Sequence, residues 1–380
     1  MSRHHQVPLG EILTPCRDEI RVSPDELYQT AGIFNHGRGM FKRAPHLGGE
    51  TKYRTYNRLH SGEIVYSKLF GWEGSVAVVP PDFEGLCVSS EFPTFEFDER
   101  CVVPGYFSHL VGWQGLHDMM AASTSGLGQR RQRVQVEDFL SIRVPLPDVE
   151  EQYRVVHRLG RLADAAGRVG NRATRQNTAL EALHERLVSE VSTAVTLRNI
   201  LSLDCMMENV EPGSQFRLAG VYGFGRGIFS RGILRGAETS YRNLHRLRTG
   251  RVVMSRLKAF EGAVAMVPDE FDGWVVSPEF PTFSLDVDSI HPGYMELICE
   301  WSGLRNLLGR ASKGVGARRE RVGAEAFLSV SIPLPSMERQ RELAAIYTKI
   351  RHIRIVQRHR QQLLDSLRRS ALNEAFGGVE

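Results

Sequence analysis

The sequence predicts an α+β protein made of two copies of one α/β globular domain, each followed by a long helix. Three observations predict this class. The chain repeats itself at a fixed offset, strand-like and helix-like stretches mix within each copy, and a Pro-Leu-Pro triplet twice precedes a long helical stretch. We expect the two helices to pair as an antiparallel coiled coil, with the two domains related by a pseudo-two-fold axis.

The internal repeat is the strongest of these observations. Val7 aligns with Val195 (195 − 7 = 188), and this offset of 188 residues holds without a gap nearly to the end of the chain. Residues 91–95 (EFPTF) recur unchanged at 279–283. A period this long indicates two copies of a whole domain with its helix, and it excludes a solenoid of small units.

Each copy contains short apolar stretches that are typical of strands. The expected strands are residues 64–69, 75–79, 252–257 and 263–267. Residues 92–97 alternate around Pro93, which predicts an edge strand because proline offers no N–H to a neighbouring strand. One helical stretch is expected in each copy, at residues 104–120 and 292–308.

The longest predicted helix covers residues 148–191, which contain no proline and place apolar residues at alternating steps of three and four. Its apolar seam is Leu159, Leu162, Ala166, Val169, Ala173, Gln176, Leu180, Leu183 and Leu187. A second helix is expected at residues 336–375. Its apolar positions are Leu343, Ile346, Ile350, Ile353, Leu364, Leu367 and Ala371, with Gln357 and Arg360 as polar interruptions. Each helix therefore has a partner within the same chain.

Composition limits the classes of protein that remain. The chain has 380 residues, of which 42% are hydrophobic and 24% charged, as is ordinary for a soluble globular protein. The net charge of +4 permits a polyanionic partner. No apolar run reaches the ~18 residues of a membrane span. Five cysteines without a Cys-x-x-Cys pair indicate reduced thiols, and with no signal-peptide core at the start we expect a cytoplasmic protein.

At the Pro-Leu-Pro motifs the sequence resembles the specificity (S) subunit of type I restriction-modification systems. The match is carried by residues 139–147 (FLSIRVPLP) leading to Glu151-Gln152, and by residues 327–335 (FLSVSIPLP) leading to Arg339-Gln340. Residues 7–12 (VPLGEI) also fit, and the resemblance covers essentially the whole chain. The second copy departs from the family at Arg339, where glutamate is usual, which puts the capping of that helix in question.

The resemblance implies a DNA-reading subunit without chemistry of its own. It divides the chain into target-recognition domains at residues 1–147 and 195–335 and helical conserved regions at 148–194 and 336–380. In the family, each domain reads one half of a bipartite, interrupted site in double-stranded DNA, and the helices fix the gap. Two adenine-methylating modification subunits dock on it, and two ATP-driven restriction subunits can join them. No membrane partner is implied.

The resemblance also implies that this chain holds no cofactor, and that S-adenosylmethionine, ATP and Mg²⁺ belong to the partner subunits. The residues agree with a non-catalytic chain. The sequence contains no Asn/Asp-Pro-Pro-Tyr/Phe element for amino methylation and no Walker A loop. Its thirteen histidines show no metal-ligand spacing, so we expect no metal site.

Candidate DNA contacts lie in basic clusters that recur in both copies. In the first copy they are Arg38, Lys42, Arg43, Lys52, Tyr53, Arg54, Arg58, Lys68, Arg130, Arg131 and Arg133. In the second copy they are Arg226, Arg231, Tyr241, Arg242, Arg246, Arg256, Lys313, Arg318, Arg319 and Arg321. For any single arginine, a solvated loop is the alternative.

Comparison of the two copies distinguishes two kinds of DNA contact. We expect duplicated positions to grip the DNA backbone or to hold the fold. Positions that read sequence should be among those that differ between the copies. Asn35-His36 differs in this way from Gly223-Phe224, and Lys52 differs from Ser240.

Two other function classes also fit the sequence: a stand-alone bipartite DNA-binding regulator, and a scaffold whose two domains bind proteins. A metal-dependent nuclease is disfavoured. Asp25 and Lys52 could belong to a nuclease constellation, but the second copy has Gly213 and Ser240 at these positions.

Overall fold

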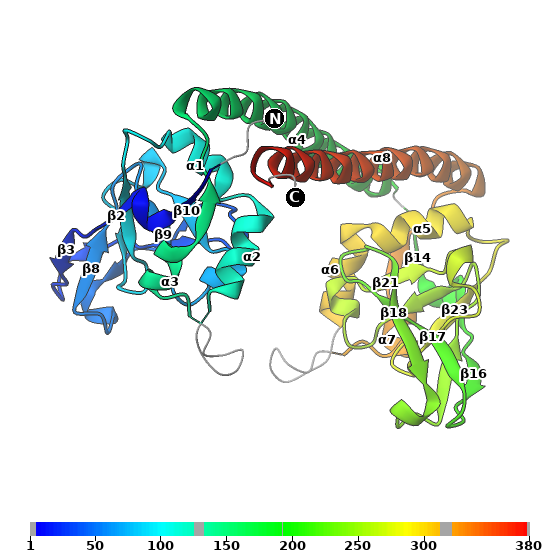
Figure 1. The fold of residues 1–380 in the computed structure, drawn as a ribbon. Coiled ribbons are helices and arrows are strands. Elements are labelled where there is room, and N and C mark those ends of the chain that lie inside the picture. Colours follow the sequence, from blue (N-terminus) through cyan, green and yellow to red (C-terminus); the bar gives the residue numbers. More distant parts are fainter. Residues whose placement is uncertain (1–4, 125–132, 192, 312–320, 378–380) are drawn as a thin grey trace. The chain divides into compact units, whose positions relative to one another are not determined.

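The computed structural model describes residues 5–124, 133–191, 193–311 and 321–377 (Figure 1). The chain divides into two compact units, and the division passes through both long helices. Unit 1 comprises residues 1–171 and 359–380, and unit 2 comprises residues 172–358. Each unit therefore holds one globular domain, the first half of the helix that follows it, and the last half of the other long helix.

Unit 1 begins with a domain of short strands and helices. Its strands are β1 (Gln6–Pro8), β2 (Leu13–Cys16), β3 (Glu19–Arg21), β4 (Leu27–Tyr28), β5 (Ala31–Ile33), β6 (Met40–Lys42), β7 (His46–Leu47), β8 (Thr55–Arg58), β9 (Ile64–Tyr66), β10 (Val76–Val78), β11 (Cys87–Val88), β12 (Thr94–Phe97) and β13 (Arg143–Pro145). Its helices are α1 (Pro104–Leu110), α2 (Gln114–Ala122) and α3 (Val136–Ser141), with 3-10 turns η1 (Leu9–Glu11), η2 (Gly48–Glu50), η3 (Gly71–Glu73) and η4 (Pro81–Phe83).

The domain of unit 2 repeats this order. Its strands are β14 (Ala194–Thr196), β15 (Leu201–Leu203), β16 (Met206–Asn209), β17 (Gln215–Val221), β18 (Ile228–Arg235), β19 (Asn243–Arg246), β20 (Val252–Met254), β21 (Val264–Met266), β22 (Val275–Val276), β23 (Thr282–Leu285) and β24 (Ser331–Pro333). Its helices are α5 (Pro292–Glu300), α6 (Ser302–Ala311) and α7 (Ala324–Leu328), with turns η5 (Leu197–Asn199), η6 (Gly236–Glu238), η7 (Ala259–Glu261) and η8 (Asp269–Phe271).

The duplication predicted from the sequence is confirmed by the boundaries of these elements. Strand β8 starts at Thr55 and β19 at Asn243 (243 − 55 = 188), and the 3-10 turns fall at the same offset. In both domains the first and last strands pair, with Val7 opposite Val144 and Val195 opposite Ile332. The chain therefore enters and leaves each domain at one place.

The edge-strand prediction for residues 92–97 is wrong. Strand β12 lies inside the sheet β10-β9-β12-β2, and β23 is likewise internal in β15-β23-β20-β21. The reason is that Pro93 precedes the strand instead of lying within it, so no ladder N–H is lost. The carbonyl of Pro93 even accepts a bond from the Tyr66 amide at 3.4 Å.

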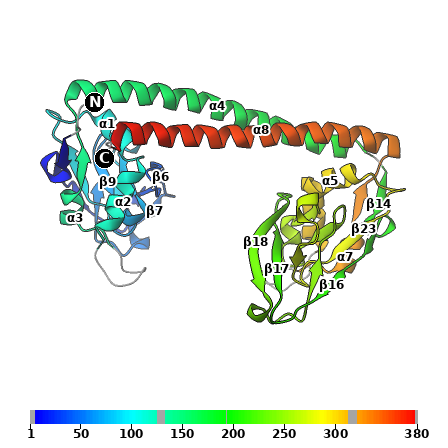
Figure 2. The same cartoon turned by 45° about the vertical axis from the view of Figure 1, so that its right-hand side comes forward.

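The two copies differ most in one hairpin. In unit 2 it is a continuous pair of long strands, labelled β17 and β18 in Figures 1 and 2, with a register shift between Arg217 and Ala219. In unit 1 the same hairpin is divided into β5–β6 and β4–β7. Pro45 lies in this division, where unit 2 has Ile233 paired with Arg217. Because proline cannot donate to a strand ladder, Pro45 interrupts the pairing.

The helical stretch expected at residues 104–120 is present but broken into α1 and α2. Its counterpart is broken into α5 and α6. Trp113 ends the break in unit 1 as the N-cap of α2, where it is half-buried. Its ring packs on Phe376 with centroids 6.0 Å apart. The interior of unit 1 thus includes the last turn of the second long helix.

The long helices run as α4 (Val149–Ser189) and α8 (Met337–Phe376), within one or two residues of their predicted ends. In unit 2, His184 packs on Tyr347 and Gln357 donates to Gln176 at 3.0 Å. Between these two contacts the position on α4 moves back by eight residues (184 − 176), while the position on α8 moves forward by ten (357 − 347). The helices are antiparallel, which confirms the predicted pairing. None of the helices in the described residues combines the length and apolar character needed to cross a membrane.

Part of the predicted apolar seam is wrong. Leu159, Leu187, Leu343, Ile350 and Ala371 are buried as expected. However, four seam residues are exposed: Leu162, Leu183, Ile353 and Leu367. Other side chains on the two helices are buried in their place, among them His184, Val188, Tyr347 and Phe376, and Arg354 is half-buried. His184 and Arg354 are polar, so a search for apolar periodicity does not find them.

The start of α8 resolves the question raised by Arg339. The Glu151 amide donates to the Asp148 carboxylate at 2.8 Å, and the Arg339 amide donates to the Ser336 hydroxyl at 3.4 Å. Asp148 caps α4 and Ser336 caps α8, each through the backbone amide three residues later, so the side-chain charge at position 151 or 339 does not decide the capping. The change to Arg339 is balanced by Glu342, with which it forms an ion pair at 2.7 Å.

Candidate nucleic-acid interface

The tip of one hairpin has the same unusual backbone in both units. His36 in unit 1 and Phe224 in unit 2 have φ of 59° and 61°, the only non-glycine residues with positive φ among the described ones. Each is followed by a glycine with positive φ, Gly37 or Gly225. The turn therefore reverses the chain tightly and holds a bulky side chain where glycine or asparagine is usual.

The tip is fixed to the rest of its domain by backbone contacts. The His36 amide donates to the Glu73 carbonyl at 2.8 Å and the Gly37 amide donates to the Gly74 carbonyl at 2.9 Å. A Cβ added at Gly37 would overlap the carbonyl oxygen of Val111. Only glycine fits this close approach at positive φ, so the tip is clamped between the end of η3 and the α1–α2 junction.

Unit 2 repeats these contacts. The Phe224 amide donates to the Glu261 carbonyl at 2.7 Å, and the Gly225 amide donates to the Gly262 carbonyl at 3.1 Å. A Cβ at Gly225 would lie 2.7 Å from the Cα of Glu300. The two domains thus present their tips on the same framework.

Behind the tip of unit 1, an arginine lies on a column of aromatic rings. Phe41 pairs across the hairpin with Gly32, which leaves room for its ring, and Phe34 packs on Phe41 at 4.7 Å. The Arg38 guanidinium lies 5.5 Å from the centre of the Phe34 ring, and its Nε donates to the Asn35 carbonyl at 2.9 Å. Only its terminal nitrogens have no partner among the described residues.

The equivalent column in unit 2 is closer-packed. Tyr222 stacks on Phe229 at 4.0 Å, and the Arg226 guanidinium lies 4.9 Å from the Tyr222 ring. Arg226 also donates from Nε to the Gly223 carbonyl at 3.1 Å. Arg305 of α6 lies 5.2 Å from the Phe224 ring on another side. In both units an exposed arginine is thus held by an aromatic ring and by a hydrogen bond from its Nε.

A second basic group lies next to the tip. Lys68 follows β9 and leads into η3, whose end binds the tip. The Lys68 carbonyl accepts a bond from Val134 at 3.0 Å, so residues 133 and 134 are fixed beside it. Nη1 of Arg133 lies 3.3 Å from both carboxylate oxygens of Glu91. Arg133 therefore anchors the segment that leads from the Arg-rich stretch into α3.

The same group recurs in unit 2 with a longer ion pair. Arg321 Nη1 lies 3.8 Å from Glu279, and the Arg256 carbonyl accepts a bond from Val322 at 3.0 Å. We call these residues and the tips the tip regions. In unit 1 the tip region is Phe34, His36, Arg38, Lys68 and Arg133. In unit 2 it is Tyr222, Phe224, Arg226, Arg256, Arg305 and Arg321.

Other sequence-predicted residues lie away from the tips. Strand β18 leads from the tip of unit 2 over eight residues, roughly 25 Å of strand, to η6 and the exposed Tyr241 and Arg242. Lys52, Tyr53 and Arg54 hold the equivalent place in unit 1. The structure does not bring them together with Arg38 or Arg226.

Several predicted contacts are engaged within the fold. Arg246 donates from Nε to Glu208 at 2.9 Å and from Nη1 to the Gly273 carbonyl at 3.2 Å. Arg58 lies 3.6 Å from Asp18, and Lys42 lies 3.6 Å from Asp82. Arg43 packs over Phe41, and Arg231 is exposed on β18.

Five predicted contacts lie outside the described residues: Arg130, Arg131, Lys313, Arg318 and Arg319. Conversely, sequence reasoning missed Phe34, Tyr222 and Arg305. The local sequence does not mark the two rings, because the packing of Phe34 on Phe41 and of Tyr222 on Phe229 depends on cross-strand register. Arg305 is not marked either, since its place depends on how α6 packs against the tip.

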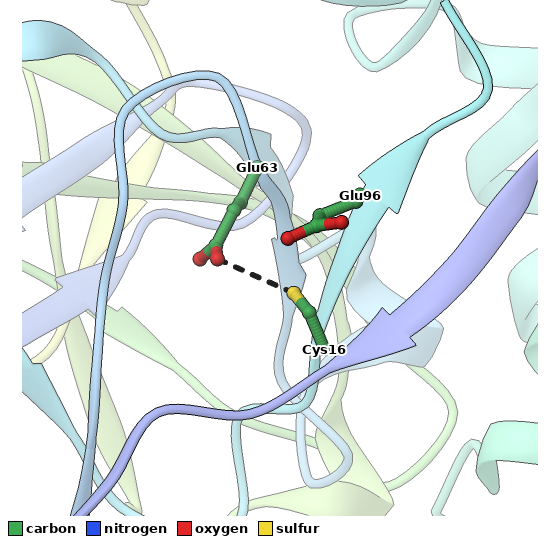
Figure 3. Close-up of side chains that lie close together, drawn as sticks. All are labelled: Cys16, Glu63 and Glu96. Carbon is green, nitrogen blue, oxygen red and sulfur yellow. Dashed lines mark hydrogen bonds between the residues drawn. The ribbon is translucent and has the colours of Figure 1, made fainter.

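One cluster of metal-ligand type occurs among the described residues, at Cys16, Glu63 and Glu96 (Figure 3). The Cys16 thiol donates to Glu63 Oε1 at 3.3 Å, and Glu63 Oε2 accepts from the His60 amide at 3.1 Å. Burial raises the pKa of Cys16 to about 12, and burial also raises the pKa of Glu63. A protonated thiol is a poor ligand, and Glu63 is already bonded.

Unit 2 explains this cluster as a structural contact. The residues at the same three positions are Asp204, Arg251 and Ser284. Asp204 and Arg251 form an ion pair at 2.8 Å where unit 1 has the thiol–carboxylate bond. Each pair joins the end of the second strand of its domain (β2 or β15) to the turn before β9 or β20. We therefore assign no metal to this cluster.

Comparison with known proteins identifies the fold. No protein-family model and no curated protein matches the sequence. A solved structure reported for the complex assembly and conformational transition of the type I R-M system matches with a TM-score of 0.63 and 19% identity, covering 98% of this chain and 97% of that chain. The S subunit of a type I restriction-modification system from M. genitalium matches with a TM-score of 0.51 and 12% identity, covering 98% and 96%. The chain has the fold of a type I S subunit.

The HsdS subunit from Thermoanaerobacter tengcongensis also matches, with a TM-score of 0.46, 20% identity, and 98% and 96% coverage. The S-subunit fold accounts for the order of elements seen here, with two mixed domains and two long helices. It confirms the resemblance inferred from the Pro-Leu-Pro motifs at the level of the fold. The residues that contact DNA remain a prediction, and the tip regions are the part of this S-subunit fold to which the geometry points.

Proposed function

We propose that the chain is the sequence-specific DNA-recognition subunit of a type I restriction-modification complex. Each globular domain would read one half of a bipartite, interrupted site in double-stranded DNA. One observation carries the proposal. Two copies of an S-subunit domain present the same tip backbone and the same ring-mounted arginine, while the side chain at the tip differs between them.

The chemistry of the tip regions suits DNA. Arg38 and Arg226 are each fixed by a ring and by an Nε hydrogen bond, so their terminal nitrogens can form a bidentate contact at little further cost in side-chain entropy. Such donors bind a phosphate or the O6 and N7 of guanine. Exposed rings at the tips, such as Phe224 with 58% of its surface accessible, can contact bases directly.

The long helices would set the spacer between half-sites and dock the modification subunits. Apolar side chains remain exposed on them in each unit, Leu363 and Leu367 in unit 1 and Ile355 and Val356 in unit 2. Exposed apolar groups of this number are typical of surfaces that a protein partner covers. The methyl transfer and any cleavage would belong to partner subunits, which would hold S-adenosylmethionine, ATP and Mg²⁺.

Co-expression of this chain with a type I methyltransferase, followed by purification of the complex, tests the proposal. We expect a stable complex that selects a bipartite site from a random duplex library. Its affinity should fall steeply with salt, because bound Lys and Arg displace counterions from DNA. Site selection without any methyltransferase partner would favour the stand-alone regulator. Partner binding that is insensitive to salt and to DNA would favour the protein scaffold.

A further inference from the structure

We infer that His36 and Phe224 are specificity-determining residues, each contacting the bases of the half-site that its domain reads. The inference rests on the proposed function and makes it more specific. It assigns the difference between the two half-sites to one position of the fold, whereas the arginines that the tips share would make contacts common to both halves.

Backbone strain is the first argument. A side chain at φ near +60° brings Cβ close to the following carbonyl oxygen, so glycine is preferred there and a β-substituted ring costs free energy. Both copies keep a ring at this position. An unfavourable conformation that persists in both copies calls for a compensating gain elsewhere.

Burial of the two rings does not provide that gain. Phe224 is 58% exposed although it is a large apolar residue, and His36 is also exposed. The nearest ring to His36 is that of His117, with centroids 6.1 Å apart. Two guanidinium groups, of Arg226 and Arg305, lie 5.9 and 5.2 Å from the Phe224 ring. These contacts leave both side chains exposed, so each remains available to a partner outside the chain.

The frame around the residue is rigid and shared. Two backbone hydrogen bonds and a glycine in close approach hold each tip, so the side chain at position 36 or 224 projects from the same place in each domain. A change of side chain on a constant frame alters what is contacted without altering how the domain docks. Two domains that dock on DNA in the same way but recognise different bases require this arrangement.

The two side chains offer different chemistry. Histidine can donate or accept a hydrogen bond at a base edge. Phenylalanine offers only apolar contact, as with the methyl group of thymine in the major groove. We therefore expect a hydrogen-bonded contact in the half-site of unit 1 and an apolar contact in that of unit 2. The flanking guanidinium groups of Arg226 and Arg305 would bring that ring against the negatively charged DNA surface.

Glycine substitutions provide a clean test. His36→Gly and Phe224→Gly remove the ring and relieve the strain, so the fold should be retained. Each variant of the full chain, in complex with its methyltransferase, would select sites from a random duplex library. We expect each variant to lose base discrimination by roughly ten-fold or more at one or two positions of a single half-site, with the other half-site unchanged.

Two further variants complete the test. Exchanging the rings, with His36→Phe and Phe224→His in one chain, should exchange the base preference at those positions between the half-sites. Ile233→Ala removes an exposed apolar side chain from the same hairpin away from the tip, and it should leave both half-sites unchanged. Thermal unfolding of each variant shows that the fold is intact.

The outcomes separate the inference from the proposed function. If the wild-type complex selects no DNA site, the proposed function fails. If the wild type selects a bipartite site and both glycine variants select the same site with the same discrimination, the inference is overturned and the proposed function stands. Loss of discrimination in both half-sites from a single glycine variant would also overturn the inference, because the effect would not be local.

Discussion

The side-chain oxygen of Gln152 accepts a hydrogen bond from the backbone amide of Val103 at 2.8 Å, where the first long helix meets its domain. Its amide nitrogen donates to the carbonyls of Cys101 and Pro147 at 2.8 and 2.9 Å. Gln340 repeats the three bonds with His291, Ser289 and Pro335. Both glutamines are fully buried. The glutamine of each Pro-Leu-Pro motif thus fixes the direction in which a long helix leaves its domain.

Replacing this glutamine should destabilise its unit. Gln152→Leu leaves two carbonyls and one amide buried without partners, so we expect a loss of about 2–4 kcal/mol in the free energy of unfolding, measured with urea. Gln340→Leu should cost a similar amount in unit 2. Gln361→Leu, on an exposed face of α8, is the matched control and should change stability by less than about 0.5 kcal/mol. An equally mild effect of Gln152→Leu would contradict the assigned role.

His60 should make the stability of unit 1 depend on pH. A hydrogen bond to Glu84 at 3.0 Å, together with one to Asp18 at 3.1 Å, raises the pKa of His60. Because the folded pKa lies above the unfolded value of about 6.5, the stabilisation is complete below pH 6.5. It is lost as the pH rises through the folded pKa.

The second copy offers the matched variant for His60. Arg248 occupies its position and lies 3.4 Å from Asp272, the counterpart of Glu84, as a permanent charge. We expect His60→Arg to match the wild type in melting temperature at pH 5.5 and to exceed it at pH 8.5. A difference between wild type and variant that does not change with pH would show that His60 contributes no titratable stabilisation.

Alanine substitutions at two glycines of the tip should distinguish the cost of backbone strain from the cost of a steric overlap. Both Gly37 and Gly39 have positive φ, but a Cβ at Gly39 meets nothing within 4 Å, whereas one at Gly37 overlaps Val111. Gly39→Ala should therefore cost about 1 kcal/mol from backbone strain alone. Gly37→Ala should cost roughly 2–4 kcal/mol, because the tip must also move. Equal costs in urea unfolding would show that the tip is not clamped against the α1–α2 junction.

Arg38 should contribute affinity without changing the sequence that is read. If it grips a phosphate, Arg38→Ala lowers affinity roughly ten-fold and reduces the slope of log K against log salt by about 1. The half-site of unit 1 should keep its base preferences. Arg100→Ala is the control, because this side chain is 89% exposed and pairs with Asp98. A slope unchanged by Arg38→Ala, or lowered equally by Arg100→Ala, would remove Arg38 from the interface.

Much of the fold follows from the sequence, because the repeat at 188 residues appears in most elements and the long helices start at capping residues. The failures have physical causes. Strand β12 begins at Thr94, one residue after Pro93, and the contact face of the long helices includes His184 and Arg354, whose polar side chains an apolar pattern does not register. Local periodicity describes which residues are apolar, but burial depends on what the facing helix supplies.

The candidate site was less accessible to sequence reasoning. The Gly-Arg-Gly turns at Arg38 and Arg226 mark a tight loop, and the difference between His36 and Phe224 is visible in the repeat. The ring columns are not, because they depend on cross-strand register, which places Gly32 opposite Phe41. Arg133 is marked by the sequence as a candidate contact, but its ion pair with Glu91 is not, because it joins residues 42 positions apart in the chain.

The most direct test of the account is the methylome of cells that express this chain with a type I modification subunit that co-purifies with it. We expect adenine methylation at one bipartite motif with a fixed spacer, dependent on this chain. The two half-sites should show partial inverted similarity, since the domains share their framework and differ at the tips. New methylation at a single uninterrupted motif, or none that depends on this chain, would contradict the central claim.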